Sequence, residues 1–317
     1  MSSGKDPFGD RMKMYESFQT QQRVMFRLPV CVRLDGKNFS RFTKGLKRPY
    51  DEGMSQAMIK MAELLLIETK AKIAYTQSDE ITLLFSNGAD MDSPKLDPKS
   101  IIAYGGRYFK LMSLLPAKAS VYFNKLLPEF LPSKTDEDPV FDCRVWQVPN
   151  LMEAANVLLW RWFDARKNSV AMAAQSVYGH KQLHQKKRED MQAMLLEKGI
   201  DWNDYPEFFR TGTFIQRRKV SANLTEEELA RIPEKHREGA RHTMRNKTFL
   251  LDLPPFEKVL NRVDVAFYEA DPITAADIGD DQLKKFSLMT GPGAGLQPGH
   301  SFRPLFEEVQ RLSGEIE

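Results

Sequence analysis

Acidic residues follow two expected β-strands in this sequence, and carboxylates placed at strand ends can bind metal ions. The apolar run 28–34, LPVCVRL, is typical of a buried strand and is followed directly by Asp35 and Gly36. The segment 72–85, KIAYTQSDEITLLF, has two apolar runs around a polar turn, Gln77, Ser78, Asp79 and Glu80. This pattern predicts a β-hairpin. Mg²⁺ prefers oxygen ligands, and a pair of such ions promotes phosphoryl transfer. Because acidic residues also serve as ordinary turn and capping residues, the pattern alone leaves both interpretations open.

A helix should connect the first strand to the hairpin. Apolar residues recur at helical spacing over residues 52–70, and Asp51 is a candidate N-cap. A strand that returns through a helix usually lies parallel to the first strand and beside it. We therefore expect Asp35 and Asp79 to meet at one end of a sheet. With the Gly36 carbonyl, they are the candidate metal ligands.

The remaining pattern predicts further helices and strands. Helices are expected over 11–27, 100–125, 153–178, 182–198 and 304–312, with Pro116 ending or kinking the second of them. Strands are expected over 141–148 and 214–220. A charged segment, 223–245, contains a helix start at Thr225. We divide the chain into a catalytic domain with an N-terminal arm, a part that completes the catalytic core, and a charged C-terminal extension: 1–148, 149–220 and 221–317.

The bulk composition is that of a globular protein and names no function. The 317 residues are 42% hydrophobic, and the net charge is only +3, too small to identify a nucleic-acid binder. Basic residues do cluster locally, for example at 186–188 and 217–219. Cys31 and Cys143 are expected to be core residues in a reducing compartment. No apolar run reaches the ~20 residues that span a membrane, so a cytoplasmic location is expected.

Several motifs together resemble the tRNA-histidine guanylyltransferases and their bacterial and archaeal relatives, the 3′-to-5′ polymerases. That family has an R-x-D-G-x-x-F-x-x-F segment, matched by 33-RLDGKNFSRF-42, and a later Q-S-D-E hairpin, matched by 77-QSDE-80. The resemblance covers residues 8 to 220 and continues through 105-GGRYFK-110, 141-FDCR-144 and 160-WRWFDARKNS-169. The combination is highly specific, although each motif alone is not.

The resemblance implies an α+β fold: a polymerase- and cyclase-like palm, of ferredoxin-like βαββαβ order, with helical additions. It implies catalysis by Asp35, Asp79 and Glu80, with two Mg²⁺ held by Asp35, Gly36 and Asp79. It also implies ATP, GTP and other nucleoside triphosphates as substrates, bound near Lys37, Asn38, Phe39, Ser78, Arg107 and Lys110. The RNA partner would be a 5′-truncated tRNA. The assembly would be a homotetramer, a dimer of dimers.

One departure shifts the expected activity within the family. Members that add G to tRNA-His carry His-Ile-Asn-Asn where this chain has Arg166, Lys167, Asn168 and Ser169. Other segments, such as 9-GDRMKMYE-16 and 199-GIDWND-204, look more like the bacterial branch, which repairs tRNA 5′ ends with a template. We therefore favour template-dependent 5′-end repair.

Other interpretations stay open at this stage. They are G addition to tRNA-His, a nucleotide cyclase that needs no RNA, and an RNA-binding palm protein without catalysis. The basic clusters disfavour the cyclase, and the presence of every proposed metal ligand disfavours the non-catalytic protein. Trp160, Trp162 and Phe163 can stack on bases, although aromatic residues in an apolar helix are more often core.

Overall fold

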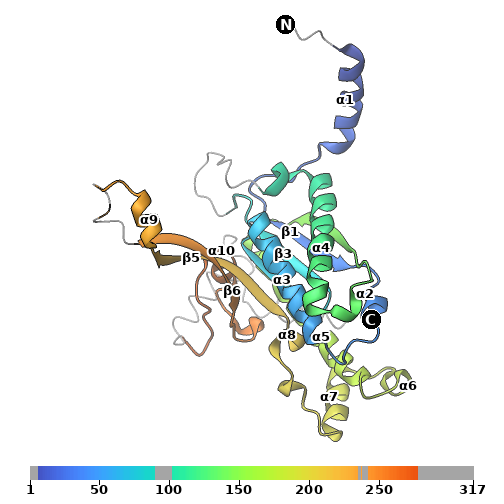
Figure 1. The fold of residues 1–317 in the computed structure, drawn as a ribbon. Coiled ribbons are helices and arrows are strands. Elements are labelled where there is room, and N and C mark those ends of the chain that lie inside the picture. Colours follow the sequence, from blue (N-terminus) through green and yellow to red (C-terminus); the bar gives the residue numbers. More distant parts are fainter. Residues whose placement is uncertain (1–5, 90–101, 235–236, 238–241, 278–317) are drawn as a thin grey trace, which may run out of the picture.

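The structure is a computed structural model that describes residues 6–89, 102–234, 237 and 242–277. Its centre is a six-stranded antiparallel sheet with the order β4-β1-β3-β2-β5-β6 (Figure 1). The strands are β1 (Val30–Gly36), β2 (Ile73–Gln77), β3 (Glu80–Phe85), β4 (Phe141–Gln147), β5 (Thr213–Asn223) and β6 (His242–Leu251). With helices α3 and α4 between them, the first four strands follow the predicted βαββαβ order. The predicted fold class is confirmed.

Ten α-helices lie in the part of the chain that the structure describes. They are α1 (Pro7–Thr20), α2 (Phe39–Phe42), α3 (Glu52–Thr69), α4 (Tyr108–Phe130), α5 (Leu151–Gln175), α6 (His180–Leu183), α7 (Arg188–Glu197), α8 (Glu207–Arg210), α9 (Glu226–Arg231) and α10 (Arg262–Tyr268). Short 3-10 turns include η4 (Trp202–Asp204) and η6 (Phe256–Lys258). Asp51 caps α3 as predicted, because its carboxylate accepts a hydrogen bond from the Met54 N–H at 3.1 Å.

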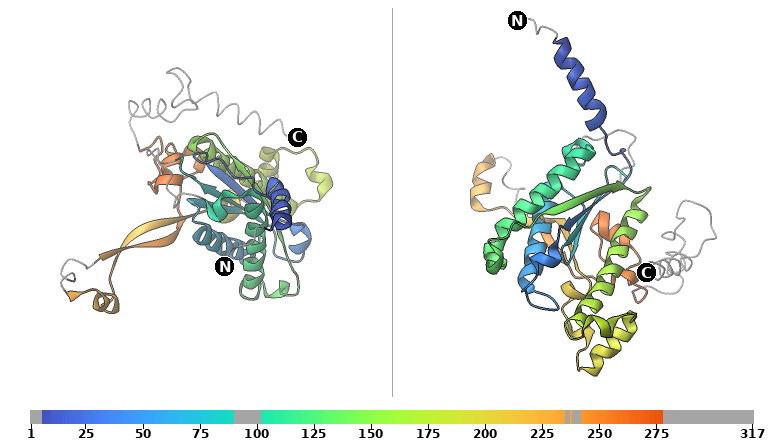
Figure 2. Two further views of the ribbon diagram at one scale, coloured as in Figure 1. Left: turned by 90° about the horizontal axis from the view of Figure 1, so that it is seen from above. Right: turned by 90° about the vertical axis from the view of Figure 1, so that its right-hand side faces the viewer.

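Helices cover both faces of the sheet. Helices α3 and α4 pack on one face, where they share a core with Val30, Val32 and Leu34 of β1. Helix α5 packs on the other face with Cys31, and α10 joins it there (Figures 1 and 2). Since side chains alternate along a strand, Arg33 and Asp35 point to the face that carries α5. Polar groups of β1 therefore lie between the sheet and α5.

The expected neighbour of β1 is wrong. We predicted that β2 would lie beside β1, but β3 lies between them and pairs with both strands. The hairpin folds back so that its second strand enters the sheet centre, where all of its residues are buried. The consequence for the candidate site is small, because the turn between β2 and β3 still meets the end of β1.

Other boundaries also differ from the predictions. Helix α1 ends at Thr20 rather than near residue 27, and α4 continues through Pro116 to Phe130. Strand β6 was not predicted, and the boundary that we placed at residue 220 falls inside β5. The expected helix over 304–312 lies outside the described residues.

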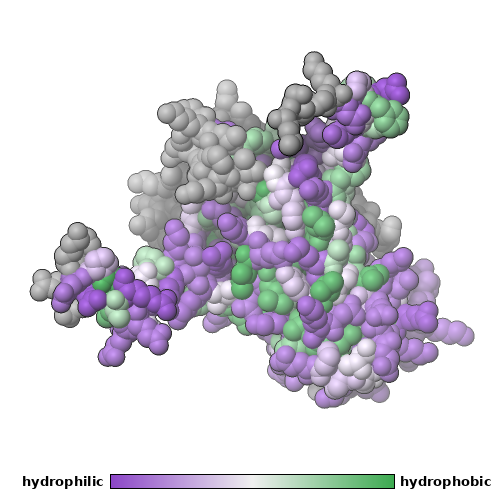
Figure 3. Space-filling view, turned by 45° about the horizontal axis from the view of Figure 1, so that its top comes forward, coloured by the Kyte–Doolittle hydropathy of each residue, from purple (hydrophilic) through white to green (hydrophobic). Residues whose placement is uncertain are grey.

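Two elements extend away from the sheet and its helices. The hairpin of β5 and β6 continues in register to the pair Asn223 and His242, and α9 lies at its far end (Figure 2). The far end of this hairpin is mainly hydrophilic (Figure 3). Helix α1 also projects, and none of its residues is buried.

Both cysteines are free thiols, as expected for core residues. Cys31 is fully buried and Cys143 half-buried, and burial raises the pKa of each thiol to about 12. Within the described residues, no helix is long and apolar enough to cross a membrane.

Candidate active site

The end of β1 and the turn of the β2–β3 hairpin bring Asp35 and Asp79 together. The Gly36 N–H donates a hydrogen bond to the Asp79 carbonyl at 3.1 Å, and Asp35 is the direct cross-strand partner of Glu80. Ser78 occupies the left-handed region with φ +50°, which a tight hairpin turn requires. Gly36 is needed because a Cβ at this position would lie 2.2 Å from the Phe39 ring. Local geometry therefore fixes both carboxylates at one end of the sheet.

The two carboxylates destabilise each other in the absence of a cation. The pKa of Asp79 is raised, first by burial and second by the negative charge of Asp35. A divalent cation between them would remove this repulsion. Among the described residues no group of three or more His, Cys, Asp and Glu could hold a metal. Mg²⁺ does not need three, because it usually binds one or two carboxylates together with phosphate and water. The donor set of Asp35, Asp79 and the Gly36 carbonyl thus fits Mg²⁺.

Glu80 is held by an arginine from helix α5. Arg161 donates from Nε to Glu80 Oε1 at 2.7 Å and from Nη2 to Oε2 at 2.6 Å, and it also binds Asp164 at 2.9 Å. Arg33 lies 3.9 Å from the same carboxylate. Burial raises the pKa of Glu80, and Arg161 offsets part of that rise. Arg161 thus binds both carboxylate oxygens of Glu80. Glu80 therefore has a supporting role beside the two aspartates.

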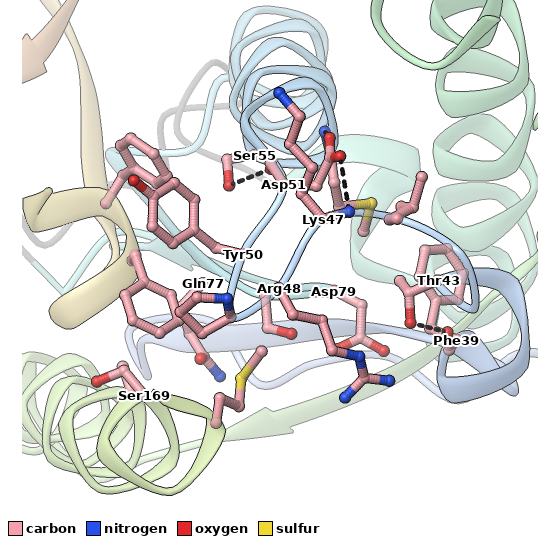
Figure 4. Close-up of a pocket in the computed structure, with 18 of the residues that line it drawn as sticks. Phe39, Thr43, Lys47, Arg48, Tyr50, Asp51, Ser55, Gln77, Asp79 and Ser169 are labelled. Atoms are coloured by element: carbon pink, nitrogen blue, oxygen red, sulfur yellow. Dashed lines mark hydrogen bonds between the residues drawn. The ribbon is translucent and has the colours of Figure 1, made fainter. Parts of the chain in front are cut away.

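Two hollows adjoin the Asp79 turn and share part of their lining. The larger has a volume of about 390 Å³ and is lined by the loop from α2 to α3, by α5 and by α8 (Figure 4). Arg48 extends into this cavity, which Asp79 and Ser169 also line. The smaller hollow, about 360 Å³, is lined by Asp35, Glu80 and Arg161. Gln77, Ser78, Asp79 and Met172 belong to both.

The larger cavity has a cationic part and an aromatic part. Lys47 and Arg48 line one side of it. On the other side the Tyr50 ring lies 4.9 Å from Phe209 and 5.3 Å from Phe208, measured between ring centroids. Cations next to aromatic rings suit a ligand with phosphate groups and a flat base.

The residues that we expected at a nucleotide divide into two groups. Lys37, Asn38, Phe39 and Ser78 lie next to the carboxylates, at the end of β1 and in the hairpin turn. The Phe39 ring is only 3% exposed and packs against Phe42, Phe123 and Phe141, so it stabilises the core.

Arg107 and Lys110 lie at the opposite end of the sheet. Helix α4 begins beside Gln147, to which the Tyr108 hydroxyl donates at 3.5 Å. Gln147 pairs with Val30, whereas Asp35 lies five residues further along β1. At ~3.3 Å per residue the two ends are roughly 17 Å apart. Within one chain, Arg107 and Lys110 are therefore not brought to Asp35 and Asp79.

Sequence reasoning did not identify the role of Arg161, Asp164 or the aromatic wall of Tyr50, Phe208 and Phe209. Arg161 lies in the segment 160–169, which carries the family resemblance, so the motif marked its position. Its partner Glu80 is 81 residues away in sequence, and only the fold shows that the two meet.

Several known proteins are similar to this chain. Residues 9–149 match the family model described as tRNAHis guanylyltransferase. An uncharacterized mimivirus protein is 28% identical and aligns over 88% of this chain and 96% of its own length. A solved structure of a bacterial tRNA(His) guanylyltransferase-like protein in complex with ATP is 35% identical, with a TM-score of 0.58. The match covers 67% of this chain and 87% of that protein.

The chain belongs to the tRNA(His) guanylyltransferase family. A second solved member, a bacterial guanylyltransferase-like protein in complex with GTP, is 27% identical with a TM-score of 0.59. The match covers 80% of this chain and 95% of that protein. Members of the tRNA(His) guanylyltransferase family are nucleotidyltransferases that act on tRNA. The enzyme class that the two sequence motifs predicted is therefore confirmed.

Proposed function

We propose that the protein adds nucleotides to the 5′ end of tRNA under the direction of a template, as a 3′-to-5′ repair polymerase. The observation that carries this proposal is the meeting of Asp35, Gly36 and Asp79 beside a cavity that contains Arg48. Similar bacterial proteins have been solved with ATP and with GTP, which supports nucleoside triphosphates as substrates here.

The segment Arg166–Lys167–Asn168–Ser169 supports repair over G addition to tRNA-His. Ser169 is 2% exposed, donates to the Arg210 carbonyl at 2.9 Å and accepts from the Trp202 indole at 3.2 Å. Arg166 binds Glu257 at 3.3 Å. Both ends of the segment thus anchor α5 to its neighbours, which leaves fewer of its groups to recognise one tRNA. G addition is the second candidate, because the matching family model is described by that activity.

The chain's own groups would orient the reactants. Asp35, Asp79 and the Gly36 carbonyl would hold Mg²⁺, which when bound neutralises charge on the transferring phosphoryl group. Arg161 fixes Glu80 on the strand that follows Asp79. Lys47 and Arg48 attract the triphosphate, and the aromatic side of the cavity receives the base. The 3′-hydroxyl of that nucleotide then attacks the 5′ phosphorus of the RNA. It displaces pyrophosphate from a 5′-triphosphate end, or AMP from a 5′-monophosphate end that ATP has first adenylylated.

The test uses four tRNA transcripts that lack the first 5′ nucleotide and differ only in the base opposite the gap. Each is incubated with Mg²⁺ and all four labelled nucleoside triphosphates, and the added nucleotide is identified on a gel. We expect the added base to be complementary to the opposing base. Addition of G to every transcript would support the second candidate. RNA binding without addition would support a non-catalytic protein.

Replacing Arg48 by alanine should weaken nucleotide binding specifically. Loss of one charge-assisted contact to phosphate is expected to raise the KM for the nucleoside triphosphate by about tenfold. The KM for RNA should change by less than about threefold, because Arg48 lines the nucleotide cavity. Arg41→Ala is the matched control, since Arg41 is exposed on α2 and does not line either hollow. Equal effects of the two substitutions would contradict this role.

We also propose the dimer-of-dimers assembly that the family resemblance implies. Helix α1 presents exposed apolar side chains, Phe8 at 66%, Tyr15 at 57% and Phe18 at 76%, which a second chain would cover. Assembly would also give Arg107 and Lys110 of one copy a route to the carboxylates of another. Light scattering is expected to show a tetramer, and Phe18→Glu should shift it towards smaller species. A monomer at micromolar concentration would contradict the proposal.

A further inference from the structure

Trp160 is an exposed indole next to the candidate site. The chain has four tryptophans. Trp162 and Trp202 are 4% and 5% exposed, and Trp146 packs partly buried against the core beneath α5, whereas Trp160 is 47% exposed. Single exposed apolar side chains are common on protein surfaces, so exposure alone does not mark a site, and the groups around this indole decide its role. Flat aromatic side chains of this kind stack on nucleobases without regard to base identity.

Two guanidinium groups hold the ring in place. The Cζ atom of Arg161 lies 4.6 Å from the ring centroid, and that of Arg33 lies 5.6 Å from it. Both arginine side chains are nearly buried, at 8% and 14% exposure, between α5 and the sheet. They therefore cover the inner side of the indole and leave the other side to solvent. A ring fixed in this way loses little freedom when a base stacks on it.

Both arginines connect the Trp160 ring to the carboxylates of the candidate site. Arg161 binds Glu80, the cross-strand partner of Asp35. Arg33 is two residues before Asp35 on the same face of β1, about 7 Å along the strand. Trp160 is therefore near the place where we propose that transfer occurs.

A third arginine lies near this ring. Arg144 is exposed and is the cross-strand partner of Arg33, so two arginines lie side by side on this face. Like charges in that arrangement repel each other unless an anion lies near them. The Arg33 Nε atom is buried and has no hydrogen-bond partner in the structure. Arg33 shares the Glu80 carboxylate with Arg161. An aromatic face near the exposed Arg144 fits a nucleic acid, with a base on the indole and a phosphate at that guanidinium group.

We propose that Trp160 is a stacking platform for a nucleobase of the RNA substrate, next to the reacting 5′ end. The proposal rests on the proposed function, since it assigns a contact to that RNA. The occupant is the RNA rather than the free nucleotide, because Trp160 lines neither of the two hollows at Asp79. Arg33 and Arg161 act through the ring as positioning residues.

Steady-state kinetics test the platform. Trp160→Ala is expected to raise the KM for a 5′-truncated tRNA transcript by about tenfold or more, as loss of base stacking does. The KM for the nucleoside triphosphate should stay within about twofold. Trp160→Phe keeps a flat ring and should stay within about threefold of the wild type. Phe249→Ala is the matched control, since Phe249 is 38% exposed on the edge strand β6. An unchanged KM for RNA in Trp160→Ala overturns the proposal.

Tryptophan fluorescence gives a readout that does not need turnover. Adding the same transcript without nucleotide should quench the emission of the wild-type protein, and most of this quenching should be absent from Trp160→Phe. Equal quenching in both proteins overturns the proposal, even if Trp160→Ala fails to fold. If the wild type transfers no nucleotide to RNA but shows this Trp160-dependent quenching, the proposed function fails and the platform is retained.

Discussion

Asp79→Asn is expected to reduce nucleotide transfer by at least about a thousandfold while leaving the fold intact. The substitution keeps the shape of the side chain but removes a charge that we assign to metal binding. Removing one such ligand withdraws about 4 kcal/mol or more of transition-state stabilisation. Transfer is measured as labelled nucleotide added to the 5′ end of a truncated tRNA transcript under single-turnover conditions.

The same substitution should keep or raise the thermal stability of the protein, although it reduces transfer. Burial and the charge of Asp35 raise the pKa of Asp79, so its ionised form is unfavourable in the folded protein without a cation. Asp79→Asn is therefore expected to melt at the same temperature as the wild type or higher, measured in the absence of Mg²⁺. Asp204→Asn, at an exposed carboxylate of η4, serves as the control for both measurements. Full transfer activity in Asp79→Asn would refute the assignment.

Arg161→Met is expected to be the most destabilising single change at the site. It would leave the Glu80 carboxylate buried without its partner, which typically costs about 3–5 kcal/mol. Arg33, at 3.9 Å, compensates only in part. Urea unfolding monitored by circular dichroism measures the loss. Arg166→Met is the control on the same helix, because Arg166 is 32% exposed in its pair with Glu257 and should cost less than about 1 kcal/mol.

The pH dependence of Arg161→Met follows from the pKa of Glu80. Burial already raises that pKa, and removal of Arg161 leaves burial without its main opposing influence. A folded-state pKa above the unfolded value means that the folded protein binds the proton more tightly, so stability increases as the pH falls. The cost of Arg161→Met should therefore be smaller at about pH 5 than at about pH 8.

A second substitution distinguishes an unpaired charge from lost packing. Adding Glu80→Gln to Arg161→Met removes the buried charge. The double variant should therefore recover part of the lost stability, and its cost should no longer depend on pH. If the two substitutions were merely additive and the cost did not vary with pH, the ion pair would not be the cause.

The sequence predicted the elements whose signals are local. The Asp51 cap, the apolar spacing of α3 and the polar turn at Ser78 each depend on neighbouring residues, and each agrees with the structure. The meeting of Asp35 and Asp79 also agrees, because it requires only that the turn and the end of β1 lie at the same edge of the sheet.

Features that depend on distant contacts were not predictable in this way. The insertion of β3 between β1 and β2 is decided by burial of the whole hairpin, since residues of β3 are buried on both faces. Strand β6 has a weak, largely polar pattern and is defined by its pairing with β5. The role of Arg161 could not be predicted from its place on a helix, because that role depends on its partner Glu80, which is distant in sequence. The placement of Arg107 away from Asp35 likewise follows from the direction of α4.

Direct metal binding tests the central claim that Asp35 and Asp79 form a divalent-cation site. Mn²⁺ replaces Mg²⁺ at oxygen ligands, and free Mn²⁺ is counted by electron paramagnetic resonance during a titration with ATP present. We predict two tightly bound ions in the wild type, loss of at least one of them in Asp35→Asn and in Asp79→Asn, and no loss in Asp204→Asn. Wild-type binding in both site variants would contradict the account.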